Sequence, residues 1–207
     1  MTTAILLKKL WLDGKDVITS REMEGCCAML KMDQRKSLRS LLASGKMIGI
    51  FRGVYYVKTP EELELGRMRY NHLELVAKGM AAKGVKNWYF GLYTALKLNN
   101  MTHEYFNVDY LVNDTISRPR PMKAAGSMFR FVKFKPSLFG FGVAGDPPHS
   151  DPEKTVLDLI YLWRYNGVPD GKILADVEEY ARHASKSRIR EYAKRYPKSV
   201  AELAAAL

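Results

Sequence analysis

The chain has 207 residues and a mass of 23.6 kDa, the size of one or two domains. Its 47% hydrophobic and 27% charged residues allow a packed core and exclude a wholly disordered chain. No apolar run approaches the roughly 18 residues of a membrane span. The basic pair Lys8 and Lys9 follows the first apolar stretch, which is the wrong order for a secretory signal. The adjacent Cys26 and Cys27 indicate neither a disulfide framework nor a metal site, so we expect a cytoplasmic protein.

The net charge is +11 and is distributed unevenly along the chain. Residues 1–60 contribute +6, residues 61–150 contribute +4, and residues 151–207 contribute only +1. A basic excess of this kind favours a polyanionic partner, either nucleic acid or an anionic membrane surface. The first 60 residues are therefore where we look first for a binding surface.

Three helices are predicted before residue 45. Residues 3–12 are apolar with helical spacing, and Thr19 followed by Glu22 forms a capping box that begins a second helix. Asp33 is a suitable N-cap for a third helix at 34–44, with its inward positions at Leu38, Leu41 and Leu42. Two strands follow, at 47–51 and 54–57, joined by Arg52 and Gly53. Strand alternation places one of Tyr55 and Tyr56 in the core.

Three short helices followed by a hairpin are typical of a winged helix-turn-helix domain, which we assign to residues 1–60. Arginine reads guanine and glutamine reads adenine in the major groove, and either can hold a phosphate. The start of the second helix would direct free backbone N–H groups at a phosphate, and a wing arginine can enter a minor groove. An ordinary solvated helix would present similar side chains, but the coincidence of these features favours DNA binding. The candidate DNA-binding residues are Thr19, Ser20, Gln34, Arg35, Lys36, Arg39, Ser40, Lys46 and Arg52.

The remainder of the chain is predicted to be an α+β domain with a helical C-terminal end. We expect an amphipathic linking helix at 61–84 and the second domain at 85–207. Its predicted helices are at 88–98, at 151–163 and in two or three pieces over 171–206, and its predicted strands are at 106–112, 128–135 and 139–143.

A second basic surface is predicted in this domain, where residues 118–135 contain six basic and no acidic side chains. These residues would bind RNA, DNA or an acidic protein face, and a mobile solvated loop is an equally good interpretation. The six residues are Arg118, Arg120, Lys123, Arg130, Lys133 and Lys135.

Features of an enzyme are scarce. The four histidines lack metal-ligand spacing, and the chain has no glycine-rich phosphate loop or nucleophile elbow. A nuclease cluster of Asp109, Asp114, Glu153 and Lys154 is the weakest alternative, because Glu153 is better explained as a first-turn acid favoured by the helix dipole. We expect no catalytic residues, no metal and no cofactor.

Three motifs occur in order along the chain. They are the segment 18–57 with Arg52-Gly53-Val54-Tyr55 at its hairpin, the aromatic-Gly-x-x-x-Ala-Leu segment at 90–96, and Pro152-Glu153-Lys154-Thr155. Together they resemble the AbiEi antitoxins and transcriptional regulators of type IV toxin–antitoxin systems. The resemblance covers most of residues 15–200, although the middle section is more compact than is usual in that family.

The resemblance implies a cytoplasmic phage-defence protein with two activities. Its N-terminal domain would bind inverted repeats in its own promoter as double-stranded DNA, two copies at a time, and repress the operon. The family's promoter contacts would fall in the region of Gln34, Arg35, Lys36, Arg39 and Arg52. The C-terminal domain would counteract a nucleotidyltransferase toxin. A module that neutralises a toxin by direct contact, and a standalone winged-helix regulator without a toxin, are the alternatives.

Overall fold

The computed structural model describes residues 3–207 and divides the chain into two compact units, which are described in turn. The first unit runs to Lys86 and includes residues 123–127, and the second contains residues 87–122 and 128–207. Residues 1 and 2 of the predicted N-terminal domain lie outside the described part. The protein is α+β, as predicted. No helix within residues 3–207 combines the length and apolar character needed to cross a membrane.

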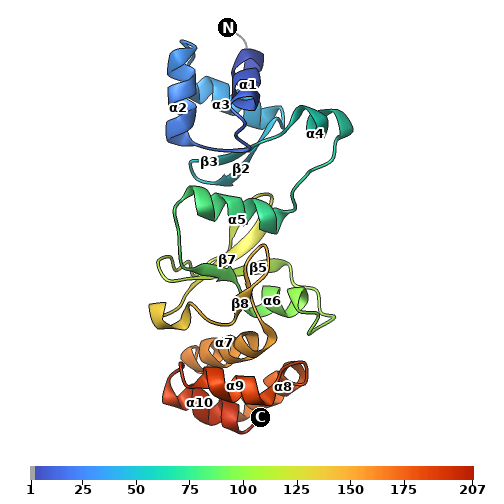
Figure 1. Cartoon of the computed structure of the whole chain (residues 1–207), viewed down its shortest axis with the longest axis vertical. Coiled ribbons are helices and arrows are strands. Elements are labelled where there is room, and N and C mark those ends of the chain that lie inside the picture. Colours follow the sequence, from blue (N-terminus) through green and yellow to red (C-terminus); the bar gives the residue numbers. More distant parts are fainter. Residues whose placement is uncertain (1–2) are drawn as a thin grey trace. The chain divides into compact units, whose positions relative to one another are not determined.

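The first unit combines five helices with a three-stranded antiparallel sheet in the order β1-β3-β2 (Figure 1). The three predicted helices and the hairpin are present, whereas β1 was not predicted, since three residues are too few to show alternation. The elements are α1 (Thr3–Leu12), β1 (Val17–Thr19), α2 (Ser20–Met29), α3 (Gln34–Ala43), β2 (Met47–Phe51), β3 (Val54–Val57), α4 (Pro60–Leu65) and α5 (His72–Ala82).

The start of α2 carries the predicted capping box. Thr19 Oγ1 accepts from the Glu22 N–H at 3.3 Å, and Glu22 Oε2 accepts from the Thr19 N–H at 2.9 Å. Both cysteines are buried in the core formed by the first three helices. Leu41 is fully buried, but the prediction for Leu42 is wrong, since it is 36% exposed. One further residue along a helix turns the side chain by about 100°, away from the core.

The predicted linking helix at 61–84 is in fact two helices. Gly66 ends α4 in the left-handed conformation, with φ at 64°, and Asn71 caps α5. The carboxylate of Glu62 is buried between them and β3, where it accepts from Tyr56 Oη and the Arg69 N–H, both at 2.6 Å. Helix α5 packs on the three-stranded sheet, so this segment is part of the first unit's core.

The second unit is built on a six-stranded mixed sheet in the order β6-β7-β5-β4-β9-β8, of which residues 123–124 of β6 and Ser127 of β7 are grouped with the first unit. Strand β5 pairs parallel with β7 and antiparallel with β4. The elements are β4 (Trp88–Phe90), α6 (Leu92–Leu98), β5 (Val108–Asn113), β6 (Met122–Ala124), β7 (Ser127–Lys133), η1 (Pro136–Leu138), β8 (Val143–Ala144), β9 (His149–Ser150), α7 (Pro152–Tyr165), α8 (Asp170–Ala181), α9 (Lys186–Ala193) and α10 (Lys198–Ala205).

Two predictions for this unit need correction. The helix expected at 88–98 begins only at Leu92, because residues 88–90 form β4 in the middle of the sheet. The strand expected at 139–143 is mostly loop, with the short β8 beginning at Val143. The strands near 108–113 and 127–133 are confirmed, and the segment expected to hold two or three helices holds three, α8, α9 and α10.

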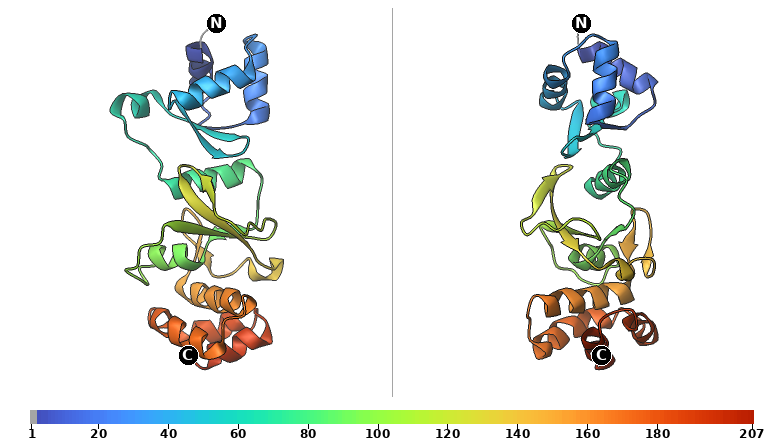
Figure 2. Two further views of the ribbon diagram at one scale, coloured as in Figure 1. Left: turned by 180° about the vertical axis from the view of Figure 1, so that it is seen from behind. Right: turned by 90° about the vertical axis from the view of Figure 1, so that its left-hand side faces the viewer.

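Helix α7 is the centre of the second unit. It contacts α6 and β9 on one side and α8, α9 and α10 on the other. Figures 1 and 2 show α7 in orange between the sheet and the C-terminal helices in red. Every residue from Glu153 to Ile160 is buried, including three charged side chains. The polar groups of α7 must therefore find partners within the protein.

Candidate nucleic-acid interface

The outward face of α3 carries exposed basic side chains. Arg35, Lys36, Arg39 and Ser40 are exposed, whereas Ser37 and Leu41 on the opposite side are buried. Within residues 3–207, the side chains of Arg35, Lys36 and Arg39 make no hydrogen bond or ion pair. They are therefore free to contact an anionic partner.

Gln34, the first residue of α3, has a structural role that was not predicted. Its Nε2 donates to the Ser20 carbonyl oxygen at 2.7 Å, in a partly buried position. This bond uses one of the two Nε2 hydrogens and joins the start of α3 to the start of α2. Gln34 therefore positions the helix with part of its hydrogen-bonding capacity.

The backbone amides of Thr19 and Ser20, at the start of α2, both have protein partners. The Thr19 N–H donates to Glu22, and the Ser20 N–H donates to the Gly53 carbonyl oxygen at 2.8 Å. The expectation that Thr19 and Ser20 direct free N–H groups at a phosphate is therefore wrong. A hydrogen bond from Lys15 and the contacts with Thr19 lower the pKa of Glu22 to about 2. The N-terminus of α2 is thus already compensated by a carboxylate of the protein.

The turn between β2 and β3 holds Arg52 and Gly53. Arg52 has an exposed side chain, and its carbonyl oxygen accepts from Lys83 Nζ at 2.9 Å. Gly53 has a φ of 79°, and a Cβ at this position would lie 3.2 Å from Ser20 Oγ. Lys46 is half-buried just after α3, with its backbone bonded to Leu41 and Lys58. The turn is consequently held against the start of α2, with the Arg52 side chain in solvent.

A cavity of about 580 Å³ in the second unit collects four of the six residues of the second basic stretch. Its lining combines aromatic side chains with four basic ones, those of Arg118, Arg130, Lys133 and Lys135. Arg120 is exposed but is not part of this lining, and Lys123 is grouped with the first unit. The charge predicted from the sequence is present, whereas the aromatic component was not predicted.

The acidic residues of the alternative nuclease cluster have protein partners of their own. Asp109 accepts from Lys97 Nζ at 3.0 Å, and Asp114 accepts from Asn87 Nδ2 at 2.6 Å. Glu153 lies in the first turn of α7 and accepts from the Ser185 N–H at 2.9 Å. Nowhere in the described chain do three or more His, Cys, Asp or Glu side chains form a group that could hold a metal.

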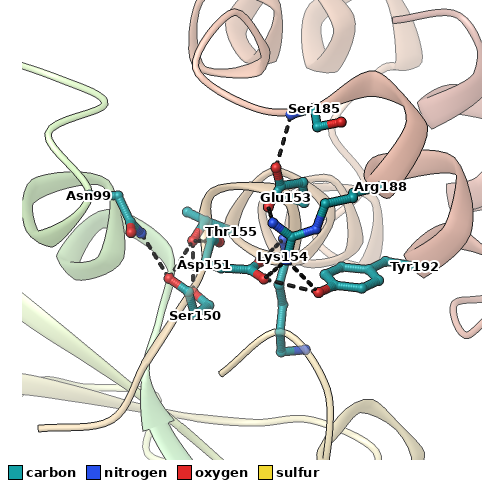
Figure 3. Close-up of polar contacts among 9 residues, drawn as sticks. All are labelled: Asn99, Ser150, Asp151, Glu153, Lys154, Thr155, Ser185, Arg188 and Tyr192. Atoms are coloured by element: carbon teal, nitrogen blue, oxygen red, sulfur yellow. Dashed lines mark hydrogen bonds and ion pairs between the residues drawn. The ribbon is translucent and has the colours of Figure 1, made fainter. Parts of the chain in front are cut away.

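A dense polar network surrounds the start of α7 (Figure 3). Asp151 caps the helix and its Oδ2 accepts from Arg188 at 3.0 Å and from Tyr192 at 3.1 Å. Arg188 also lies 3.4 Å from Glu153 Oε2 as an ion pair, although this oxygen lacks a hydrogen bond of good geometry. On the other side, Asn99 Nδ2 donates to the Ser150 carbonyl oxygen at 2.8 Å. The network fixes α7 to α9 and to the end of α6.

The first two turns of α7 contain a buried ion pair, which was not predicted from the sequence. Lys154 and Asp158 are both fully buried, with Nζ and Oδ1 separated by 3.4 Å. Asp158 accepts from Tyr196 Oη at 2.6 Å and Tyr89 Oη at 2.8 Å, and Lys154 donates to the Leu138 carbonyl oxygen at 2.8 Å. Burial lowers the pKa of Lys154 and raises that of Asp158, against their mutual attraction. Both groups are closed to solvent, so we assign them to the core.

These observations define an α+β protein with a helix-and-hairpin unit followed by a mixed-sheet unit that has a helical end. No protein-family model matches the sequence, and no curated protein sequence matches it either. Among solved structures, the fold is similar to the crystal structure of the RV2827C protein from Mycobacterium tuberculosis, with a TM-score of 0.60. That likeness covers 97% of this chain and 73% of the other at 12% sequence identity, so it shows a shared fold.

Proposed function

We propose that the protein is a sequence-specific DNA-binding regulator whose first unit is a winged helix-turn-helix domain. The element order α1-β1-α2-α3-β2-β3 and the sheet order β1-β3-β2 support this proposal, because they correspond to that domain's layout. In it, α3 is the recognition helix that enters the major groove, and the β2–β3 turn is the wing.

The observation that carries the proposal is the outward face of α3. Arg35, Lys36 and Arg39 are exposed and lack protein partners, while the opposite face packs into the core. Arginine in a major groove can donate two hydrogen bonds to guanine, which supplies sequence specificity. Arg52 on the wing and Lys46 would add phosphate or minor-groove contacts.

The resemblance to the AbiEi regulators extends the proposal. Two copies would bind inverted repeats in the protein's own promoter and repress its operon, and the second unit would counteract a nucleotidyltransferase toxin. Three segments support this resemblance: the winged-helix motif, the aromatic-Gly-x-x-x-Ala-Leu segment and the Pro-Glu-Lys-Thr segment.

The test compares binding to the protein's own upstream DNA with binding to scrambled DNA, by fluorescence anisotropy across a salt series. Arg39→Ala should remove about 1–3 kcal/mol of binding free energy on the upstream DNA and much less on the scrambled DNA. Lys46→Ala should weaken both equally and reduce the salt slope by about one unit, because it removes a phosphate contact. Arg190→Ala, an exposed substitution on α9, is the matched control.

Two results would contradict the proposal. Equal losses on both DNAs for Arg39→Ala would remove its role in specificity. Weak wild-type binding that disappears with salt on both DNAs would mean that the charge of +11 attracts DNA only generically.

A further inference from the structure

The cavity of the second unit has a lining of one charge sign. Its charged residues are all basic: Arg118, Arg130, Lys133 and Lys135. None of the described residues that line the cavity is acidic. Like charges at close range repel, so this arrangement stabilises the protein little by itself. It is complementary to an anion.

The backbone that carries two of these cations is held in place by the protein. Buried Asn113 donates to the carbonyl oxygens of Ile116 and Val132, and its Oδ1 accepts from the Thr115 and Ile116 N–H groups. The Arg118 N–H donates to the Phe131 carbonyl oxygen at 3.1 Å. These bonds hold the segment with Arg118 beside β7, the strand that carries Arg130. The basic side of the cavity is therefore a built surface.

The other side of the cavity is aromatic. Tyr93 receives a hydrogen bond from Trp163 Nε1 at 3.0 Å, and its ring lies 5.0 Å from that of Tyr110. At the end of α7, Tyr165 also lines the cavity and is 82% exposed, with no ring partner within residues 3–207. A large exposed aromatic ring beside a fixed aromatic wall offers a stacking surface for a planar group.

We propose that this cavity binds an unpaired nucleotide, with its phosphate on the basic side and its base against the aromatic side. Its volume of about 580 Å³ lies within the usual range of small-ligand sites, about 300–1,000 Å³. An acidic peptide would use the cations and leave the aromatic wall unused. A base pair inside a duplex has no free face to stack. The site is thus distinct in chemistry from the duplex surface proposed on α3.

The experiment measures binding to the full chain by isothermal titration calorimetry, with four probes. They are a nucleoside 5′-monophosphate, a single-stranded tetranucleotide, inorganic phosphate and tetraglutamate. If the natural ligand is a single-stranded nucleic acid, the tetranucleotide binds more tightly than the monophosphate. If the natural ligand is a free nucleotide, the two probes bind equally tightly. Both nucleotide probes bind more tightly than phosphate or tetraglutamate.

Substitutions separate the two sides of the cavity. Tyr165→Ala weakens nucleotide binding by about 5- to 140-fold, the range measured for base–aromatic stacking, and Tyr165→Phe retains it. Arg130→Ala weakens all four anions and reduces the salt slope by about 0.7 units on the tetranucleotide. Tyr105→Ala is the matched control, because this tyrosine of the second unit is 84% exposed but does not line the cavity.

The proposal is overturned if neither nucleotide probe binds, or if phosphate or tetraglutamate binds as tightly as the nucleotides. An equal loss in Tyr165→Ala and Tyr105→Ala also overturns it. Arg39→Ala leaves tetranucleotide binding unchanged, so this site and the proposed DNA surface are tested independently.

Discussion

At the scale of single residues, the ion pair of Lys154 and Asp158 is fully buried and should contribute strongly to stability. Removing one partner of a buried ion pair leaves an uncompensated charge, which costs about 3–5 kcal/mol. We expect Asp158→Asn to lower the free energy of unfolding by about this amount, measured by urea denaturation.

The control for this prediction is Asp176→Asn. Asp176 pairs with Lys172 at 2.9 Å on the exposed side of α8 and should contribute less than about 1 kcal/mol. The double substitution Lys154→Met with Asp158→Leu should recover most of the loss. If Asp158→Asn and Asp176→Asn cost the same, Lys154 is not held by the charge of Asp158.

Glu22 links stability to pH. Its pKa is about 2 in the folded protein against 4.5 for an unperturbed group, chiefly because Lys15 and Thr19 hydrogen-bond to its carboxylate. A lowered folded-state pKa contributes stability above pH 4.5, and this contribution is lost as the pH falls from 4.5 towards 2. The side chain is 38% exposed, so after solvent screening we expect about 1 kcal/mol.

Thermal unfolding at pH 6 and pH 3 measures this effect. Glu22→Gln keeps a capping side chain but cannot titrate, so it should reduce the loss of stability between the two pH values. Glu24→Gln, on the exposed side of the same helix, should leave the loss as in the wild type. A Glu22→Gln protein with the wild-type pH dependence would contradict the prediction.

At the scale of elements, the contact of α5 with the sheet depends on a glycine. A Cβ on Gly79 would lie 2.6 Å from Ile50 Cγ2 and 2.7 Å from Phe51 Cε2. Alanine normally favours a helix over glycine by about 1 kcal/mol. At Gly79 the overlap should outweigh this gain, and we expect Gly79→Ala to destabilise the protein by about 1–3 kcal/mol in chemical denaturation.

Gly25→Ala is the control for the same unit. Gly25 lies in α2, and a Cβ there would meet nothing within 4 Å. This substitution should stabilise the protein by up to about 1 kcal/mol. Effects of the same sign at the two positions would show that α5 does not depend on close approach to the sheet.

The elements that could be predicted from the sequence are those with local signals. The capping box of Thr19 and the N-cap Asp33 identified the starts of α2 and α3, because their hydrogen bonds reach only three residues along the chain. The short strands β1 and β4 were missed, since three residues form a strand only when distant partners pair with them.

The candidate sites show the same limit. The basic stretch at 118–135 was visible in the sequence, but its aromatic counterpart comes from α6 and β5, which precede it, and from the end of α7, where Tyr165 lies 30 residues beyond Lys135. Likewise, the bond from Gln34 to Ser20 could not be predicted, because it spans 14 residues. Side-chain availability depends on tertiary contacts, which no local pattern contains.

At the scale of the whole molecule, the shared fold with RV2827C at 12% identity leaves the function open, since one fold serves many functions. The proposals therefore depend on the side chains of each unit. The first unit presents unpaired cations on a helix, which suits a duplex. The second collects cations opposite aromatic rings, which suits an unpaired base. Under the two proposals, the excess of positive charge has two separate uses.

Ser20 determines how the proposed DNA-binding unit would respond to its target. Its N–H is bonded to the β2–β3 turn at Gly53, and its carbonyl oxygen is bonded to Gln34 at the start of α3. One residue thus links the β2–β3 turn to the start of α3, the proposed wing to the proposed recognition helix. In the proposed complex the unit would hold α3 and the β2–β3 turn at a fixed spacing. It would accept operators whose major-groove and minor-groove contacts are one set distance apart, and it would reject an inserted base pair that a flexible wing would tolerate.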